Sequence, residues 1–430
     1  MIPNAPLKTS IFWASLGVSL GTGIAAQGLL AFDPAAFGGQ WFRNSTVLLA
    51  LHLSTLGFVG LLVLGVLTQF LPMLLGKALS SSFAAAVAMG TFFISALMLW
   101  CFFAAHRLQW LAASAGIGIV LSLFAFLALA AKTLAGGGGH LLTRATLASS
   151  LAYLLFTSIL GGLMAQGLVR PPLLDTDPLR LIQLHLHLGL FGFAALMIFG
   201  VSYELLPMFG LARNYSLIPG WAALVLGHLG IFSLVLSVFG GPFSAQWGGL
   251  LWPWLLGAAC LSYALQVILI AVKSLRKQHE PGPLHFRAAV VLLLAGVIWG
   301  LQLSPDATPG ACAAYVYLLL FGFVGGAIFG QLQKIVPLLS WYDRFSALAG
   351  RAKIPSAADL MPHRLPWFVP AFHLAASGLG FIGLSRSSPL LLRLSGVFGC
   401  GSFAAMILIW AACRRLGDLP SPAPALGARS

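Results

Sequence analysis

Long uninterrupted apolar runs recur along the whole chain, with Gly, Pro or charged residues at the breaks between them. In a bilayer every backbone polar group must be paired within the protein, so an apolar run of about 20 residues crosses as a helix. The strands of a membrane β-barrel would instead alternate in hydrophobicity. The runs therefore predict an all-α, polytopic membrane protein.

The composition supports this prediction. Only 7% of the 430 residues are charged, whereas a soluble globular domain carries about 25%. So few charges could not cover a soluble protein of this size, which excludes a cytosolic enzyme, a disordered chain and a secreted disulfide scaffold. The five cysteines are scattered without a CxxC pair, and we interpret them as small buried hydrophobes. The first apolar run lacks a small-residue cleavage site, so we interpret it as a span.

We predict twelve spans in a single membrane domain over residues 1–415, followed by a disordered, Pro- and Ala-rich tail over 416–430. The spans are expected near residues 11–32, 45–75, 82–105, 108–134, 144–169, 179–208, 218–240, 247–274, 284–304, 310–340, 365–385 and 388–413. Of the 23 Lys and Arg residues, 17 fall on the side of the termini and 6 on the other. The positive-inside rule then places both termini in the cytoplasm, in an inner membrane. The net charge of +14 thus reflects topology and the lipid bilayer, with no nucleic-acid partner.

Three segments of the chain align without gaps. They read HLSTLGFVGLLVLGVLTQFLPML from His52, HLGLFGFAALMIFGVSYELLPMF from His187 and YLLLFGFVGGAIFGQLQKIVPLL from Tyr317. Each has a Gly-Phe pair, a second Gly eight residues after the first and a Pro seven residues later. We therefore predict three four-helix repeats, approximately 11–134, 144–274 and 284–413, with pseudo-threefold symmetry around equivalent spans 2, 6 and 10. Two six-span halves, as in a major-facilitator transporter, do not fit this spacing.

Ionisable side chains inside the spans are candidates for function, because burying them in a membrane is costly. Five of the ten histidines lie within predicted spans, namely His52, His185, His187, His228 and His373. The others, His106, His140, His279, His285 and His363, fall in loops or at span ends, where we expect them to be solvated. Neutral imidazole is an axial ligand for heme iron and binds copper, but a lone buried histidine can equally be hydrogen-bonded to a neighbouring helix. Residues two apart in a helix point about 200° apart, so His185 and His187 are expected to face different spans.

The segment HLHLGLFGFAALMIFGVSYELLP resembles the tenth helix of heme-copper oxidase subunit I, above all in the C-family oxidases and nitric oxide reductases. That helix carries an HxH pair, then small residues, a Gly and a terminal Pro, and the family shares the twelve-span, threefold plan. The resemblance implies that one histidine of the pair binds a high-spin heme and the other a low-spin heme. The second low-spin ligand would come from helix 2, where this chain has His52. The resemblance also implies that Arg386 and Arg393, near the last outer loop, hold heme propionates, with interfacial anchoring as the alternative.

The chain departs from that family in its metal ligands. The HxH pair lies on the sixth span instead of the tenth, which has Tyr315 and Tyr317 at the aligned positions. The family's three copper-binding histidines are not reproduced, since only His228 stands on the seventh span. We therefore do not expect a three-histidine copper site or dioxygen reduction. A twelve-span protein with heme and copper is also similar to the NnrS family of nitric-oxide-stress proteins. This chain lacks the His-rich N-terminal segment of that family.

Two ligand schemes follow from the resemblance. In the first, His52 and His185 clamp one low-spin heme b. His187 then faces the tenth span and binds a second heme or a metal, with His228 or His373 on its far side. In the second, His52 and His187 form the pair and His185 serves the second pocket. The first is preferred, because in the family the leading histidine of such a pair faces the preceding repeat.

Glu204 is the only acidic residue inside a predicted span, and it aligns with Gln69 and Lys334 of the other repeats. All three are expected near the cytoplasmic ends of their spans. Three interpretations stay open: a proton entry path to a redox centre, a Glu204–Lys334 ion pair that holds two repeats in register, and snorkelling to the interface.

The leading hypothesis is a heme b-binding membrane protein of the heme-copper oxidase subunit I-like type, with one or two hemes, in electron transfer or in chemistry on O2 or NO. If it is catalytic, it is a heme-dependent oxidoreductase, but the incomplete copper-ligand set argues against a standard terminal oxidase. A non-catalytic subunit of a larger respiratory or stress-response assembly is the second hypothesis, and a transporter is the third. The chain has no CxxCH motif and no nucleotide-binding loop, so a redox donor or other membrane subunits are the expected partners.

Overall fold

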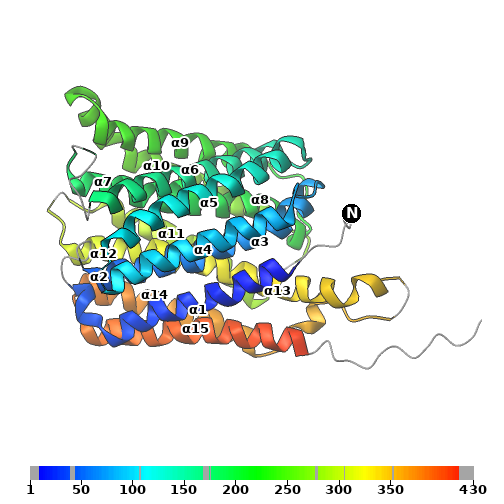
Figure 1. The fold of residues 1–430 in the computed structure, drawn as a ribbon. Coiled ribbons are helices and arrows are strands. Elements are labelled where there is room, and N and C mark those ends of the chain that lie inside the picture. The colour runs from blue at the N-terminus through cyan, green and yellow to red at the C-terminus, as the bar shows by residue number, and fades with distance from the viewer. Residues whose placement is uncertain are drawn as a thin grey trace, which may run out of the picture.

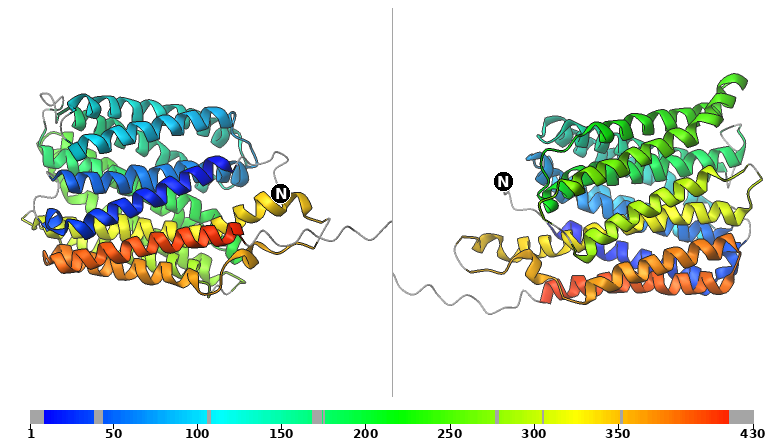
Figure 2. Two further views of the ribbon diagram at one scale, coloured as in Figure 1. Left: turned by 60° about the horizontal axis from the view of Figure 1, so that its bottom comes forward. Right: turned by 180° about the vertical axis from the view of Figure 1, so that it is seen from behind.

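A computed structural model of the chain describes residues 9–38, 44–105, 108–167, 174, 176–276, 279–304, 306–350 and 353–415. These residues form helices and no strands, and twelve of their helical stretches are long and apolar enough to cross a membrane. The helices lie side by side in one bundle (Figures 1 and 2). The predicted all-α fold with twelve spans is confirmed. The predicted tail over 416–430 and His106 lie outside the described residues.

Nine spans within the described residues contain one α-helix each: α1 (Ser10–Phe32), α4 (Ser82–Ala105), α5 (Gln109–Gly136), α6 (Leu141–Gly167), α9 (Ile218–Phe239), α10 (Pro242–Val272), α11 (Pro281–Leu301), α14 (Phe368–Ser385) and α15 (Pro389–Arg415). The second, sixth and tenth spans each have three parts. These are α2 (Ser45–His52), η3 (Leu53–Leu61) and α3 (Leu62–Leu75); α7 (Pro178–His187), η4 (Leu188–Ala195) and α8 (Leu196–Gly210); and α12 (Pro309–Tyr317), η5 (Leu318–Gly325) and α13 (Gly326–Phe345). Short 3-10 turns lie at Pro34–Gly38, Ser346–Leu348, Ala357–Leu360 and Leu365–Trp367.

The middle parts of these three spans, η3, η4 and η5, are π-helices, in which an N–H bonds five residues back instead of four. They begin directly after His52, His187 and Tyr317, the first residues of the three aligned segments. In η3 the hydroxyls of Ser54 and Thr55 donate to the carbonyl oxygens of Ala50 and Leu51, four residues back. The aligned segments therefore share one backbone distortion at one place, and such distortions are frequent at functional sites.

The second, sixth and tenth spans form the inside of the bundle. Of their apolar stretches 56%, 72% and 83% is buried, against 50% or less for the other described spans. In each, an aligned glycine packs on the span that precedes it. A Cβ atom on Gly65 would lie 2.6 Å from Ser15 of α1. One on Gly200 would lie 3.0 Å from Leu147 of α6, and one on Gly330 would lie 2.9 Å from Gly282 of α11. The absence of a side chain at these positions lets the helices approach closely.

The two ends of the described chain lie at the same end of the bundle (Figure 1). The indole rings of Trp13 in α1 and Trp410 in α15 stack with centroids 5.9 Å apart. Thr9 Oγ1 and Trp13 Nε1 donate hydrogen bonds to the Asp343 carboxylate at 2.6 and 2.7 Å, which joins the end of α13 to this cluster. An even number of spans requires this arrangement. That this end faces the cytoplasm stays a prediction from the Lys and Arg count.

The ninth span starts earlier than predicted. α11 begins at Pro281, before the expected start at residue 284, because proline is well tolerated in the first turn of a helix. This places His285 within the helix instead of at its edge. α13 likewise continues to Phe345, beyond the expected end of the tenth span at residue 340, and projects from the bundle (Figure 1).

Candidate functional site

His52 ends α2 at the point where the second span becomes a π-helix. Its Nδ1 lies 2.7 Å from the carbonyl oxygen of Leu48. A carbonyl can only accept, so Nδ1 carries the proton and Nε2 keeps a lone pair. Within the described residues no hydrogen bond engages this Nε2. The ring lies beside Phe103 of α4, with centroids 4.9 Å apart.

His185 lies in α7 of the sixth span and has the same arrangement. Its Nδ1 donates to the carbonyl oxygen of Thr157 on α6 at 3.1 Å, which leaves Nε2 with a lone pair. Gly161 of α6 makes room for the ring, since a Cβ atom there would lie 2.7 Å from Cε1 of His185. The imidazole lies within electrostatic range of that of His52 on the second span.

The pair of His52 and His185 has the chemistry of an axial ligand pair. In both, a main-chain carbonyl holds Nδ1, and in metal-binding histidines such a bond fixes the tautomer and orients the ring. Both side chains are half-buried. Among the described residues no group of three or more His, Cys, Asp or Glu side chains is arranged to hold a metal ion. The pair can thus supply two nitrogens to a heme iron, whereas zinc would need more ligands.

His187, two residues further along, is bound differently. Its Nδ1 donates to the carbonyl oxygen of Gln183 at 2.7 Å, and its Nε2 lies 3.1 Å from the hydroxyl oxygen of Tyr315 in α12. The buried ring packs against Trp252 of α10, with centroids 4.6 Å apart. His185 and His187 thus face different spans, as their spacing indicates. Nε2 of His187 is already engaged.

The expected partners of His187 lie elsewhere. Both ring nitrogens of His228 in α9 are engaged by hydroxyls of α6, those of Ser149 at 3.0 Å and Tyr153 at 2.7 Å. His373 in α14 is paired with a different histidine. Within the described residues neither contacts His187, so the structure does not assemble the predicted second site.

His285 is buried in α11, and its expected solvation is wrong. It is 1% exposed, and its Nε2 lies 3.0 Å from Nδ1 of His373, which is fully buried. Nε2 of His373 in turn donates to the carbonyl oxygen of Phe321 in η5 at 2.8 Å. Because the two histidines come from different spans, no local pattern in the sequence could have revealed the pair.

The arginines expected to hold propionates are not brought to the histidine pair. Arg386 follows α14, Arg393 lies near the start of α15, and both are exposed. Neither guanidinium group makes a hydrogen bond or ion pair with another described residue. Their positions fit the alternative interpretation, anchoring at the membrane interface.

Of the three interpretations left open for Glu204 and Lys334, the ion pair between them is not formed. Glu204 Oε1 accepts a hydrogen bond from Thr143 Oγ1 of α6 at 2.9 Å. Lys334 pairs with Glu280, the residue that precedes α11. Each residue bonds the preceding span of its own repeat, because aligned positions occupy equivalent places and need not touch.

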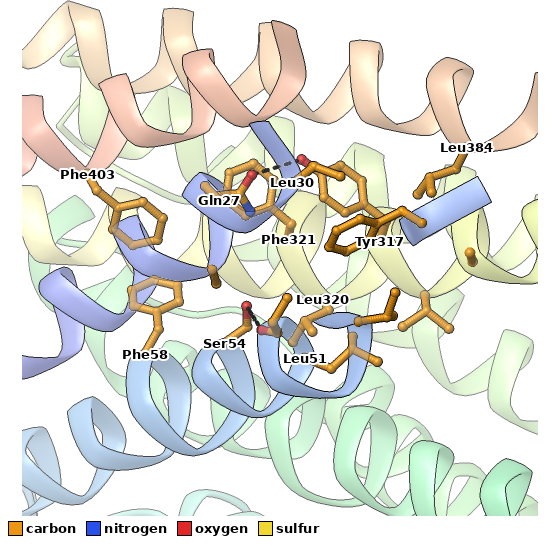
Figure 3. A pocket seen from close by; sticks show the side chains of 16 residues that line it. Gln27, Leu30, Leu51, Ser54, Phe58, Tyr317, Leu320, Phe321, Leu384 and Phe403 are labelled. Atoms are coloured by element: carbon orange, nitrogen blue, oxygen red, sulfur yellow. Dashed lines mark hydrogen bonds between the residues drawn. The ribbon is translucent and has the colours of Figure 1, made fainter. Parts of the chain in front are cut away.

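A cavity of about 70 Å³ borders the tenth span (Figure 3). Tyr317, which aligns with His52 and His187, lines it, and its hydroxyl lies 2.8 Å from Ser395 Oγ and 3.4 Å from Gln27 Oε1. Most of the other lining side chains are apolar. His52 is not among them, so the cavity is separate from the pair of His52 and His185.

The fold and these contacts define a polytopic helical membrane protein. No protein-family model matches the chain, and no curated protein matches it.

Proposed function

We propose that this protein binds heme b inside the membrane, with His52 and His185 as axial ligands. We further propose that it works in electron transfer or in chemistry on a diatomic gas such as O2 or NO, as a relative of heme-copper oxidase subunit I. Heme iron supplies one-electron redox chemistry when it is bound between such ligands.

The proposal rests above all on the matched state of the two imidazoles. Each has Nδ1 held by a carbonyl, at 2.7 Å for His52 and 3.1 Å for His185, and no other described residue hydrogen-bonds to either Nε2. The two imidazoles also lie within electrostatic range of each other. Nε2 of His187 is instead engaged by Tyr315, which favours the pairing of His52 with His185 over that with His187.

The surrounding residues orient the pair and limit access of water. The carbonyls of Leu48 and Thr157 set the ring orientations, and Gly161 leaves room for one ring. Phe103 covers His52 on the side of α4. Because no second set of ligands is assembled around His187 among the described residues, we propose one heme, held by His52 and His185.

We also infer that the three repeats are related by pseudo-threefold symmetry. Three observations support it: the common start of the π-helices, the packing of Gly65, Gly200 and Gly330 on the preceding span, and the burial of the three spans. In this arrangement the two spans with the proposed ligands would face each other inside the bundle.

A reduced-minus-oxidised spectrum with hemochrome quantitation and metal analysis tests the proposal on purified protein expressed with heme supply. We expect Soret and α bands in the wild type and loss of most heme in His52→Ala and His185→Ala. His228→Ala is the matched control, because this span histidine is bound by two hydroxyls of α6 and should keep the heme. Absence of heme bands in the wild type, or unchanged heme content in both ligand variants, would refute the assignment.

A further inference from the structure

One face of α13 carries small and polar residues in a single line. They are Gly326, Gly330, Gln333, Pro337, Ser340 and Arg344, which follow each other at alternating intervals of four and three residues. At about 100° per residue, all six lie within about 40° of one line along the helix. At about 1.5 Å per residue the line is about 27 Å long, close to the thickness of the hydrocarbon core. We call these six residues the polar face of α13.

The Arg344 half of the polar face holds buried polar atoms without partners. Within the described residues no hydrogen bond engages Oε1 or Nε2 of Gln333, Oγ of Ser340 or Nη1 of Arg344. Gln333 and Ser340 are each only 2% exposed. The backbone carbonyl of Gln333 also lacks its usual donor, because Pro337 has no N–H. Buried polar groups are normally paired with protein or with ordered water, so this half is suited to bind water.

The other end of the polar face meets the buried histidine pair. A Cβ atom on Gly326 would lie 2.9 Å from Cε1 of His373 and 3.5 Å from Nε2 of His285. Since Nε2 of His373 donates to the carbonyl of Phe321, its Nδ1 accepts the proton of Nε2 of His285. Nδ1 of His285 then carries a lone pair, and within the described residues it has no partner.

These open groups suit water and protons better than a metal ion. Only the two histidines of the pair are present, and three of their four ring nitrogens already bond to each other or to a carbonyl. A hydroxyl, an amide and an imidazole lone pair can each hydrogen-bond to ordered water, and imidazole is a common proton shuttle. The glycines at the histidine end let α13 pack closely on α11, and a Cβ atom on Gly282, one turn before His285, would lie 3.1 Å from Cβ of Gln333.

We propose that the polar face of α13 is hydrated and carries protons between the Arg344 end of the bundle and Nδ1 of His285. By the Lys and Arg count, the Arg344 end is the predicted cytoplasmic end. None of the six residues contacts His52 or His185 within the described part of the chain, so the proposal is independent of heme binding.

Water-edited solid-state NMR of the wild-type protein in lipid tests the hydration, because magnetisation passes from mobile water only to nearby groups. We expect transfer to Gln333 and Ser340 to be as fast as to the exposed Ser387. It should be several times faster than to Ser402, which is fully buried and bonded to the carbonyl of Gly399. Transfer as slow as that to Ser402 would overturn the proposal. Transfer to Ser340 without Gln333 would overturn it too, because the water would then stop short of the histidines.

Proton exchange at Nδ1 of His285, followed through the line broadening of its resonance in protein with 15N-labelled histidine, tests proton delivery. Ser340→Leu and Gln333→Leu each place an apolar side chain on the polar face, and we expect both to slow this exchange severalfold. Leu339→Met is the control, since Leu339 is equally buried but lies on the opposite side of α13 from the polar face. Exchange at the wild-type rate in either leucine variant would show that protons reach His285 by another route.

Discussion

Nε2 of His187 and the hydroxyl oxygen of Tyr315 lie 3.1 Å apart and join the sixth span to the tenth. Tyr315 precedes by two residues the position that aligns with His187, so the bond is a cross-link between different positions of two repeats. It engages the one nitrogen of His187 that a metal would need. The contact is therefore structural in this state of the protein.

Removing the hydroxyl should destabilise the bundle. Tyr315→Phe leaves a buried imidazole nitrogen unpaired, and we expect the free energy of unfolding to fall by about 1–2 kcal/mol. Reversible unfolding in mixed micelles measures this. Tyr342→Phe is the control, because the Tyr342 hydroxyl has no hydrogen bond within the described residues. Equal unfolding midpoints for the two variants would contradict the prediction.

The space beside His185 offers a test of the heme site that keeps both ligands. A Cβ atom at position 161 would lie 2.7 Å from Cε1 of His185, so Gly161→Ala should tilt the ring. Disturbing the support of a metal ligand typically weakens metal binding by about 10–100-fold, and we expect a comparable loss of heme affinity. Heme titration followed at the Soret band measures it. Gly90→Ala in α4, where a Cβ atom meets nothing within 4 Å, should bind heme like the wild type.

The ion pair between Lys334 and Glu280 should contribute little to stability. The two side chains are 18% and 52% exposed, so solvent screens the pair. A double-mutant cycle of Lys334→Gln and Glu280→Gln should give a coupling of about 0.2–1 kcal/mol that falls with added salt. The same cycle between Lys334 and Glu204 should give none. A larger coupling for Lys334 with Glu204 would restore the ion pair that the sequence alignment indicates.

The orientation can be tested by fusing a reporter to the C-terminus. Because 17 of the 23 basic residues lie on the side of the termini, we expect green fluorescent protein fused there to fluoresce and alkaline phosphatase to be inactive. Fusion in the loop between α14 and α15 should give the opposite result. Active phosphatase at the C-terminus would reverse the predicted orientation.

The spans and the special role of three of them could be predicted from the sequence. Hydrophobicity along one helix is a local signal, and the recurrence of Gly and Pro is a periodic one. The structure contains the spans that the first signal predicts and the three similar inner spans that the second indicates. The start of α11 was predicted three residues too late, because the sequence does not distinguish a proline in the first turn of a helix from a proline in a loop. That small error decided whether His285 counted as solvated or buried.

The hydrogen-bond partners could not be predicted in this way. The carbonyl of Thr157 that holds His185 and the hydroxyl of Tyr315 that holds His187 come from other spans. Whether these two groups reach the histidines depends on the rotation of each helix about its axis, which hydropathy does not encode. Glu204 and Lys334 show the same limit, since equal positions in a repeat indicate equal surroundings and not contact.

The π-helices after His52, His187 and Tyr317 have a further consequence. A π-helix turns through a smaller angle per residue than an α-helix, so it changes the rotation of everything that follows it. Each of these three spans thus consists of two α-helices joined by a π-helix, which sets their relative rotation. The half before the π-helix can orient an imidazole while the half after it orients glutamine, serine or glutamate. A one-residue deletion within the π-helix would rotate one half relative to the other without altering either.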